Sequence, residues 1–292
     1  MKPRSSNKLL PIAVLAGLSW ILPENLHLAQ VLPLMARPSQ PEGDYDCWQT
    51  ARIDPNIAPE EFSRVRTIFG YGSLIFRPGF PYKRMYPASV TGFIRRFWQR
   101  SCDHRGTPEN PGRVVALLRA DSIGKLDLGE VEVVGEVAKD DIVFGMAYEV
   151  DEADWPSVIE ALDVRERHGY TRTLAKLSPL KRDVDNAEAV DPGLGTAVVY
   201  FAHEPENSAA YTGPEVIETT AAVIANAKGP SGPNDAYLFS LVDALESHGL
   251  PPDRYLTSLS AAGAEVPPPG HVGRVIATTF ESREVLRERY KA

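Results

Sequence analysis

The sequence predicts an α+β fold, in which strands come first and most helices follow. Five segments between residues 68 and 150 are rich in Val, Ile, Phe and Tyr and are separated by Gly, Pro and Asp, as expected for strands between turns. Helical periodicity is concentrated after residue 210. This order favours separate strand and helix layers over alternating βαβ units. Of the 292 residues, 65–265 are expected to form one domain.

Seven strands are expected in chain order. They cover residues 68–73, 88–101, 113–119, 131–137, 142–150, 171–177 and 196–203. Arg95 and Arg96 alternate with aromatic residues in the second of these strands, and we interpret them as part of a solvated strand face. The polar and charged segment 181–192 is expected to be a surface loop.

The helix expected over residues 154–165 has the clearest pattern. Its apolar residues recur at i, i+3, i+4 and i+7, namely Trp155, Val158, Ile159 and Leu162. Asp154 can cap its start, and Pro156 suits a first helical turn. Gly169 follows as a C-terminal stop signal.

Three further helices are candidates. One covers residues 214–228 and ends at the pair Gly229 and Pro230. The next is capped by Asn234 or Asp235, and one of its faces carries Tyr237, Leu238, Leu241, Val242 and Leu245. The charged segment 281–290, in a C-terminal tail over 266–292, is a weaker candidate.

Residues 1–64 are expected to form an N-terminal extension that serves as a linker, and its start either carries a targeting signal or is an extension without one. Lys2, Arg4 and Lys8 precede an apolar run over 9–22, which resembles a signal peptide but lacks a clear cleavage site. The run is too short for a stable membrane span. Export or delivery to an organelle by residues 1–29 is therefore an alternative to a cytoplasmic location.

Composition excludes several classes of partner. The formal net charge of −8 gives no attraction to nucleic acid. The two cysteines, Cys47 and Cys102, are too few for a disulfide framework in a chain of this length. His104 lies close to Cys102, but no other Cys or His stands at zinc spacing, so no metal site is expected.

Two glycines bracket Tyr71 directly after the first strand. Gly70 and Gly72 permit positive φ and close approach of a ligand, and exposed amides there could hold a carboxylate or a carbonyl oxygen. Ile75 stands where a dinucleotide-binding loop needs glycine, and the pattern fits neither a P-loop nor a nucleophile elbow. A tight turn without any ligand explains the same residues equally well.

Glu166 is the candidate acid/base residue. It stands at the end of the helix over 154–165, where the helix dipole raises the pKa of a carboxyl group, while Arg165 and Arg167 lower it. A solvated helix end with local ion pairs is the alternative explanation. His168 could also serve as a base.

Four ordered groups of residues resemble one known family, the ChaC-like γ-glutamylcyclotransferases, which are glutathione-specific. These groups are 69–78; 92–99 with 103–108 and 111–115; 145–148 with 162–166 and 169–170; and 229–234 with 237–239. The resemblance implies a small, closed or nearly closed β-barrel with helices packed around it. Two departures from the family pattern are the long N-terminal extension and the longer stretch 121–141.

The resemblance also implies the site. Glu166 would be the proton acceptor, with Tyr170 and His104 as lesser candidates near it. The γ-glutamyl group would bind to the turn formed by Gly70, Tyr71, Gly72, Ser73, Leu74 and Ile75. The expected activity is that of a lyase: the α-amine of glutathione attacks its own γ-carbonyl and releases 5-oxoproline and Cys-Gly.

This reaction is expected to need no cofactor, metal or covalent nucleophile. Ring closure within one molecule can reach effective molarities of about 10⁵–10⁸ M. Three alternatives stay open: a γ-glutamyl amino acid as substrate, a γ-glutamylamine as substrate, and a binding module without turnover. Glutathione is abundant in the cytosol, which makes a cytoplasmic location the default expectation.

Overall fold

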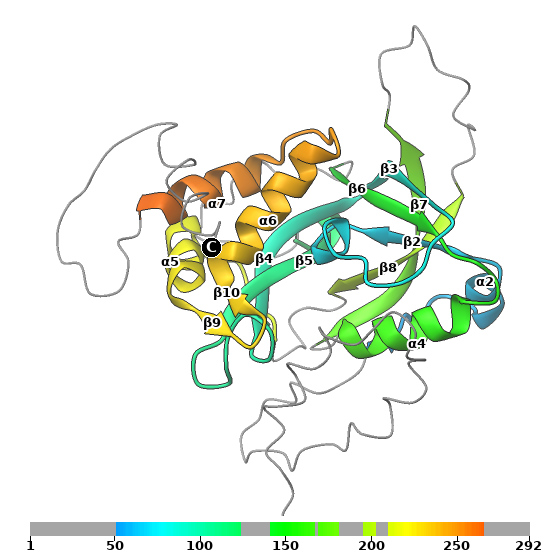
Figure 1. The fold of residues 1–292 in the computed structure, drawn as a ribbon, viewed down its shortest axis with the longest axis horizontal. Coiled ribbons are helices and arrows are strands. Elements are labelled where there is room, and N and C mark those ends of the chain that lie inside the picture. Colours follow the sequence, from blue (N-terminus) through cyan, green and yellow to red (C-terminus); the bar gives the residue numbers. More distant parts are fainter. Residues whose placement is uncertain (1–50, 124–140, 167–168, 181–194, 203–209, 266–292) are drawn as a thin grey trace, which may run out of the picture. The chain divides into compact units, whose positions relative to one another are not determined.

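The computed structural model describes residues 51–123, 141–166, 169–180, 195–202 and 210–265. Five of its strands close into a barrel (Figure 1). They are β2 (Thr67–Gly70), β3 (Arg84–Thr91), β6 (Ile142–Glu149), β7 (Tyr170–Pro179) and β8 (Thr196–Ala202). The α+β class and the barrel are thereby confirmed. The strand expected over 131–137, the loop over 181–192 and the helix over 281–290 lie outside the described residues.

The barrel closes because β7 is long enough to pair with several neighbours. Its first part pairs with β8 and its end pairs with β3, both antiparallel. β6 then joins β3 to β2, and β2 returns to β8 through a parallel bridge between Ile68 and Val198. Adjacent strand residues point to opposite faces, so Ile68 and Phe69 enter two different apolar clusters. Both faces of the barrel wall are therefore buried here.

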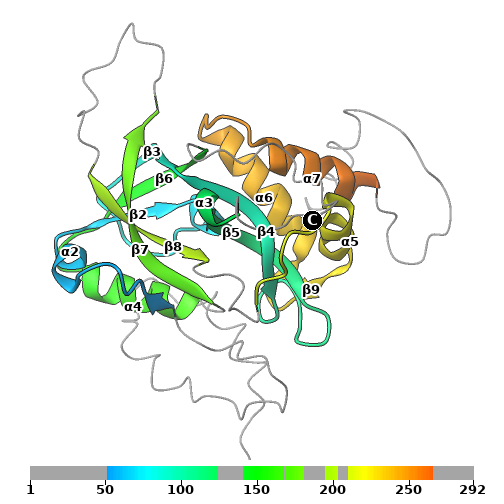
Figure 2. The same cartoon turned by 180° about the vertical axis from the view of Figure 1, so that it is seen from behind.

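The single strand predicted over 88–101 is wrong, because two strands occupy it. β3 ends at Thr91, and β4 (Phe93–Ser101) starts after Gly92, whose φ of 84° turns the chain. β4 pairs with β5 (Gly112–Arg119) in a separate ribbon, and this pairing has an irregularity between Arg96 and Gln99. The short helix α3 (Ala120–Ile123) follows. Figure 2 shows the ribbon beside β8, which β5 contacts.

Arg95 and Arg96 are buried, which corrects their assignment to a solvated strand face. Arg95 is 2 % exposed and Arg96 is 7 % exposed. Arg95 forms an ion pair with Asp253 over 3.2 Å and donates to the carbonyl of Phe144. The Arg96 guanidinium lies over the Tyr255 ring. Asp253 and Tyr255 belong to the C-terminal helical region, whose position over this ribbon the local sequence pattern does not reveal.

Three helices cover the ribbon on the side away from the barrel (Figure 1). They are α5 (Ile217–Asn226), α6 (Asn234–Ser247) and α7 (Arg254–Glu265), and only the first two were expected. The small strands β9 (Lys228–Gly229) and β10 (Gly232–Pro233) connect α5 to α6. The N-cap residue of α6 is Pro233. The side chain of Asn234 instead bonds both backbone groups of Arg113 on β5.

Helix α4 (Trp155–Arg165) confirms the clearest helical prediction. Val158 and Leu162 of its apolar face are each 2 % exposed and pack in the cluster that holds Ile68. Asp154 is the N-cap residue, and Gly169 has the positive φ of 89° expected after a helix end. Asp163 anchors the helix to the barrel by accepting hydrogen bonds from Arg172 on β7 and Tyr200 on β8.

Part of the predicted linker is structured. Strand β1 (Arg52–Ile53) pairs in parallel with β7, and helix α2 (Pro59–Ser63) follows. Between them, the Asp54 carboxylate is 1 % exposed and accepts a hydrogen bond from Thr173. In the part of the chain that the structure describes, no helix has the length and apolar character of a membrane span.

Candidate active site

The glycine turn connects β2 to a single turn of 3₁₀ helix, η3 (Ser73–Ile75). Tyr71, Leu74 and Ile75 are buried, so Leu74 and Ile75 can offer only backbone groups to a ligand. The N–H groups of Ser73 and Leu74 stand in the first turn of η3, where no acceptor exists within the helix. The turn therefore presents backbone donors beside the Ser73 hydroxyl and the buried Tyr71 phenol.

Gly72 is required for space and not for a positive φ, which corrects the sequence-based reason. Its φ is −127°, and Gly70 also lacks a positive φ. A Cβ atom placed at residue 72 would lie 2.6 Å from Val115 Cγ1 and 3.2 Å from Tyr237 Oη. The turn thus packs directly against β5 and α6, and a side chain at residue 72 would push them apart.

Glu166 stands at the C-terminal end of α4, as its C-cap residue. Its backbone N–H donates to the Leu162 carbonyl over 2.7 Å, which fixes where the side chain leaves the helix. The side chain is 18 % exposed, yet its Oε1 atom is buried. That atom has no hydrogen-bond partner among the described residues. A buried carboxylate oxygen with a free acceptor position is unusual in a folded protein and calls for an explanation.

Three influences act on the Glu166 carboxyl group. Burial raises its pKa above the ordinary value, the Arg165 guanidinium lowers it, and the Asp103 carboxylate raises it. Arg165 Nε lies 3.5 Å from Oε1, too far for a good hydrogen bond but close enough for an ion pair. The net direction is upward, toward the range in which a carboxyl group can exchange protons near neutral pH.

Tyrosines from three elements surround Glu166. Burial first, and then the Glu166 carboxylate, raise the pKa of both Tyr71 and Tyr237. Burial is also the main cause of the raised pKa of Tyr170, to which Tyr71, Tyr237 and Glu166 all contribute. Tyr237 Oη lies over Gly72. Arg165 contacts both Glu166 Oε1 and Ser73 Oγ, so the Glu166 carboxyl group lies near the glycine turn. All three phenols stay neutral and can only donate or accept hydrogen bonds there.

Arg165 connects the turn to the end of α4. Its Nη2 donates to Ser73 Oγ over 2.9 Å, and its Nη1 donates to the Pro78 carbonyl over 2.7 Å. Pro78 lies shortly after η3, so both contacts hold the segment that contains the turn. The sequence analysis treated Arg165 only as a charge beside Glu166 and did not predict this role.

The two lesser candidates differ in their surroundings. The Tyr170 hydroxyl donates to the Val115 carbonyl over 2.7 Å, so its hydrogen is used structurally. His104 is exposed, with Nδ1 lying 3.2 Å from Ser231 Oγ and Nε2 lying 3.5 Å from Asp103. Neither contact brings His104 to Glu166. Residues 167 and 168, including the alternative base His168, lie outside the described residues.

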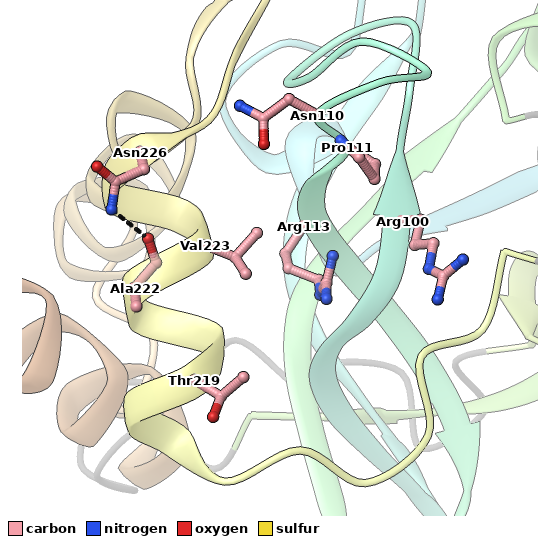
Figure 3. Close-up of a pocket in the computed structure, with 8 residues that line it drawn as sticks. All are labelled: Arg100, Asn110, Pro111, Arg113, Thr219, Ala222, Val223 and Asn226. Carbon is pink, nitrogen blue, oxygen red and sulfur yellow. Dashed lines mark hydrogen bonds between the residues drawn. The ribbon is translucent and has the colours of Figure 1, made fainter.

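A separate pocket lies between the end of the ribbon and α5 (Figure 3). Its walls come from the ends of β4 and β5, the connection between them, and one face of α5. Arg113 lines it, but its Nε and Nη2 both donate to the Glu215 carboxylate and its Nη1 donates to the Gly112 carbonyl. Asn226 donates to the carbonyl of Ala222, another lining residue. No residue proposed from the sequence contributes to this pocket.

The structure brings most of the expected site together. Gly72, Tyr71 and Glu166 are joined through Tyr237 and Arg165. Sequence reasoning did not predict that Tyr237, Arg165 and Asp103 come within electrostatic range of Glu166. Tyr237 had been placed on the apolar face of a helix, and no local pattern distinguishes a core tyrosine from one that lines a site. Within the described residues, no cluster of His, Cys, Asp and Glu has the makings of a metal site.

Comparison with known proteins agrees with this architecture. A family model described as ChaC-like protein matches residues 66–265. The glutathione-specific γ-glutamylcyclotransferase of Saccharomyces cerevisiae is 36 % identical over 220 residues, covering 66 % of this chain and 93 % of the relative. The human glutathione-specific γ-glutamylcyclotransferase 1 is 34 % identical over 204 residues, covering 68 % of this chain and 79 % of the relative.

A solved structure has the same fold. The selenomethionine-labelled γ-glutamyl cyclotransferase specific to glutathione from yeast superposes with a TM-score of 0.58 at 32 % sequence identity. The match covers 68 % of this chain and 94 % of the yeast chain. With a family model that spans about two hundred residues and relatives above 30 % identity, this chain belongs to the ChaC-like protein family.

Proposed function

We propose that this protein degrades glutathione by cyclising its γ-glutamyl group, with Glu166 as the residue that moves the proton. The observation that carries the proposal is the buried Oε1 atom of Glu166, which accepts no hydrogen bond from any described residue. Support also comes from relatives named for glutathione specificity in yeast and human. The activity belongs to the lyases, because an amide bond is broken by ring closure without water.

The proposed step balances within the substrate and one carboxylate. Glu166 takes a proton from the α-ammonium, and the free amine then attacks the γ-carbonyl carbon. The new C–N bond closes the five-membered lactam, and the amide bond to cysteine breaks. The proton held by Glu166 passes to the departing nitrogen of Cys-Gly as the bond to the γ-carbon breaks. The new lactam nitrogen then loses its second proton, which Glu166 takes up and passes to the released amine, so the amine leaves as an ammonium group and the carboxylate is restored. Such a positioned acid/base contributes roughly 10²–10⁴-fold to the rate.

The glycine turn is proposed to hold the γ-glutamyl end. Backbone N–H groups of Ser73 and Leu74 can donate to the substrate carboxylate or to the oxygen that becomes negative in the transition state. Gly70, Tyr71, Gly72 and Ile75 shape the turn and position these donors. No step requires a cofactor, because the nucleophile is part of the substrate.

The test is an assay for 5-oxoproline and Cys-Gly with glutathione, with a γ-glutamyl amino acid and a γ-glutamylamine as competing substrates. Wild type is expected to consume glutathione, and Glu166→Gln is expected to be folded and inactive. Glu160→Gln, an exposed position on the same helix, is the matched control and should keep full activity. Near-normal turnover by Glu166→Gln would overturn the assignment of the proton carrier. Preference for another γ-glutamyl compound would overturn the substrate.

Localisation is also a proposal: a cytoplasmic protein, acting where glutathione is abundant. The N-terminal apolar run supports the alternative of export or organellar delivery, and disulfides persist in the oxidising compartments that such delivery can reach. Mass spectrometry of protein taken from its cells decides between the two. An intact N-terminus with reduced Cys102 supports the cytoplasm, and a cleaved N-terminus with oxidised Cys102 overturns it.

A further inference from the structure

We infer that Arg165 is a positioning residue, which holds the glycine turn and the Glu166 carboxylate in one arrangement. The inference rests on the proposed function, because it assigns a role to the neighbour of the proposed proton carrier. Arg165 is the last residue of α4, and Ser73 begins η3. Two elements that carry opposite halves of the proposed site are therefore bridged by one side chain.

The bridge uses three different nitrogens of the guanidinium. Nη2 donates to Ser73 Oγ over 2.9 Å, Nη1 donates to the Pro78 carbonyl over 2.7 Å, and Nε lies 3.5 Å from Glu166 Oε1. A planar guanidinium fixes the directions of its donors, so three contacts from one group define its position closely. A lysine has one nitrogen and could satisfy only part of this arrangement.

The contact with Ser73 also orients a hydroxyl group. Because Ser73 Oγ accepts a hydrogen bond from Arg165, its own hydrogen points away from the guanidinium. That hydrogen is then available as a donor next to the turn amides. Arg165 would thus prepare Ser73 to bind the carboxylate or carbonyl oxygen of the γ-glutamyl group.

The charge of Arg165 has a second effect, on protonation. The described titratable groups that interact electrostatically with Glu166 come from several elements: Arg165, Asp103, Tyr71, Tyr170, Tyr200 and Tyr237. Of the two charged residues, Asp103 raises the pKa of Glu166 and Arg165 lowers it, while burial is the main cause of the net rise. Without Arg165, the pKa of Glu166 would rise further. The carboxyl group would then stay protonated up to a higher pH and could not act as a base below it.

The experiment compares Arg165→Met, Arg165→Lys and Ser73→Ala with Arg172→Met as the matched control. Arg172 also anchors α4, through Asp163, but it does not contact Glu166. Rates of 5-oxoproline release are measured across about pH 5 to 9, and thermal unfolding of each variant checks its fold. Glu166→Gln is included so that the proton-carrier assignment is tested in the same series.

Arg165→Met is expected to lower kcat/KM by about 10²-fold, the scale of a misplacement near 1 Å, and to move the acid limb of its pH profile to higher pH. Arg165→Lys should leave the acid limb at its wild-type pH and should still lower kcat/KM. Ser73→Ala should mainly raise KM. Arg172→Met should leave the acid limb in place even where it lowers stability.

A normal rate and an unshifted acid limb in Arg165→Met would overturn the inference. The proposed function would still stand in that case if Glu166→Gln is inactive. If Arg165→Met does not fold, Arg165→Lys and Ser73→Ala decide: wild-type kinetics in both would refute the bridge. An active Glu166→Gln would instead refute the assignment of the proton carrier, whatever Arg165 does.

Discussion

Tyr237 of α6 reaches across to the glycine turn, where its hydroxyl oxygen would lie 3.2 Å from a Cβ atom at residue 72. The same phenol is within electrostatic range of both Glu166 and Arg105, whose guanidinium carbon lies 5.4 Å from the centre of the Tyr237 ring. Phe76 and Phe97 hold that ring edge-on from two other elements. A helix residue thereby completes a site whose other parts belong to the barrel and to α4.

The space at residue 72 gives the first prediction. Gly72→Ala should cost about 1–3 kcal/mol of stability through overpacking and should lower activity, because the turn must move away from Val115 and Tyr237. Gly263→Ala is the matched control, since a Cβ atom there meets nothing within 4 Å. That variant should be neutral or stabilised by up to about 1 kcal/mol. Thermal unfolding and the 5-oxoproline assay measure both, and equal behaviour of the two variants would contradict the packing argument.

The hydroxyl of Tyr237 gives the second prediction. Tyr237→Phe keeps the ring contacts but removes a group over Gly72, so kcat/KM should fall by roughly tenfold, the value of about one hydrogen bond. The control is Tyr255→Phe, which loses a hydrogen bond from the Phe97 N–H to a buried phenol on α7. Tyr255→Phe should lower stability by about 1 kcal/mol and leave kcat/KM unchanged. A Tyr237→Phe enzyme of normal activity would show that this hydroxyl has no part in the reaction.

The raised pKa of Glu166 gives a prediction about stability. Burial is its main cause, so the ionised carboxylate is less stable in the folded protein than in the unfolded chain. The stability contribution of this group is therefore complete below the unfolded pKa of about 4.3 and is lost as the pH rises through the higher folded value. Above that value, Glu166→Gln should unfold at a higher temperature than wild type, and the difference should vanish under acid conditions.

Thermal unfolding of wild type and Glu166→Gln at about pH 4 and about pH 8 tests this sign. Other titrating groups are shared by the two proteins and cancel in the difference. A variant that is less stable than wild type at the higher pH would mean that Arg165 compensates the buried charge fully.

The buried pair of Arg95 and Asp253 gives the last prediction. Arg95 is almost fully buried, so Asp253→Asn leaves its charge without a partner and should destabilise the fold by about 3 kcal/mol. The comparison is Glu149→Gln, which breaks the exposed pair with Arg84 and should cost about 0–1 kcal/mol. Chemical unfolding measures both changes. Equal small losses would show that water reaches Arg95 in solution.

The sequence by itself determined the elements whose signals are local. The spacing of Trp155, Val158, Ile159 and Leu162 defined α4, because one helix face must bury its apolar residues. Most strands were predicted from segments rich in Val, Ile, Phe and Tyr that lie between turn residues. Resemblance to a family, and not periodicity, supplied the barrel, the role of the glycine turn and the choice of Glu166.

The tertiary structure alone decided what depends on contacts between distant segments. Gly92 divides one apparent strand into two, and the arginines that had been assigned to solvent are buried against Asp253 and Tyr255. The bridge from Arg165 to Ser73 and the reach of Tyr237 to Gly72 join residues from separate elements. Local pattern carries no information on such pairs, because burial and electrostatic range are set by how the barrel, the ribbon and the helices pack together.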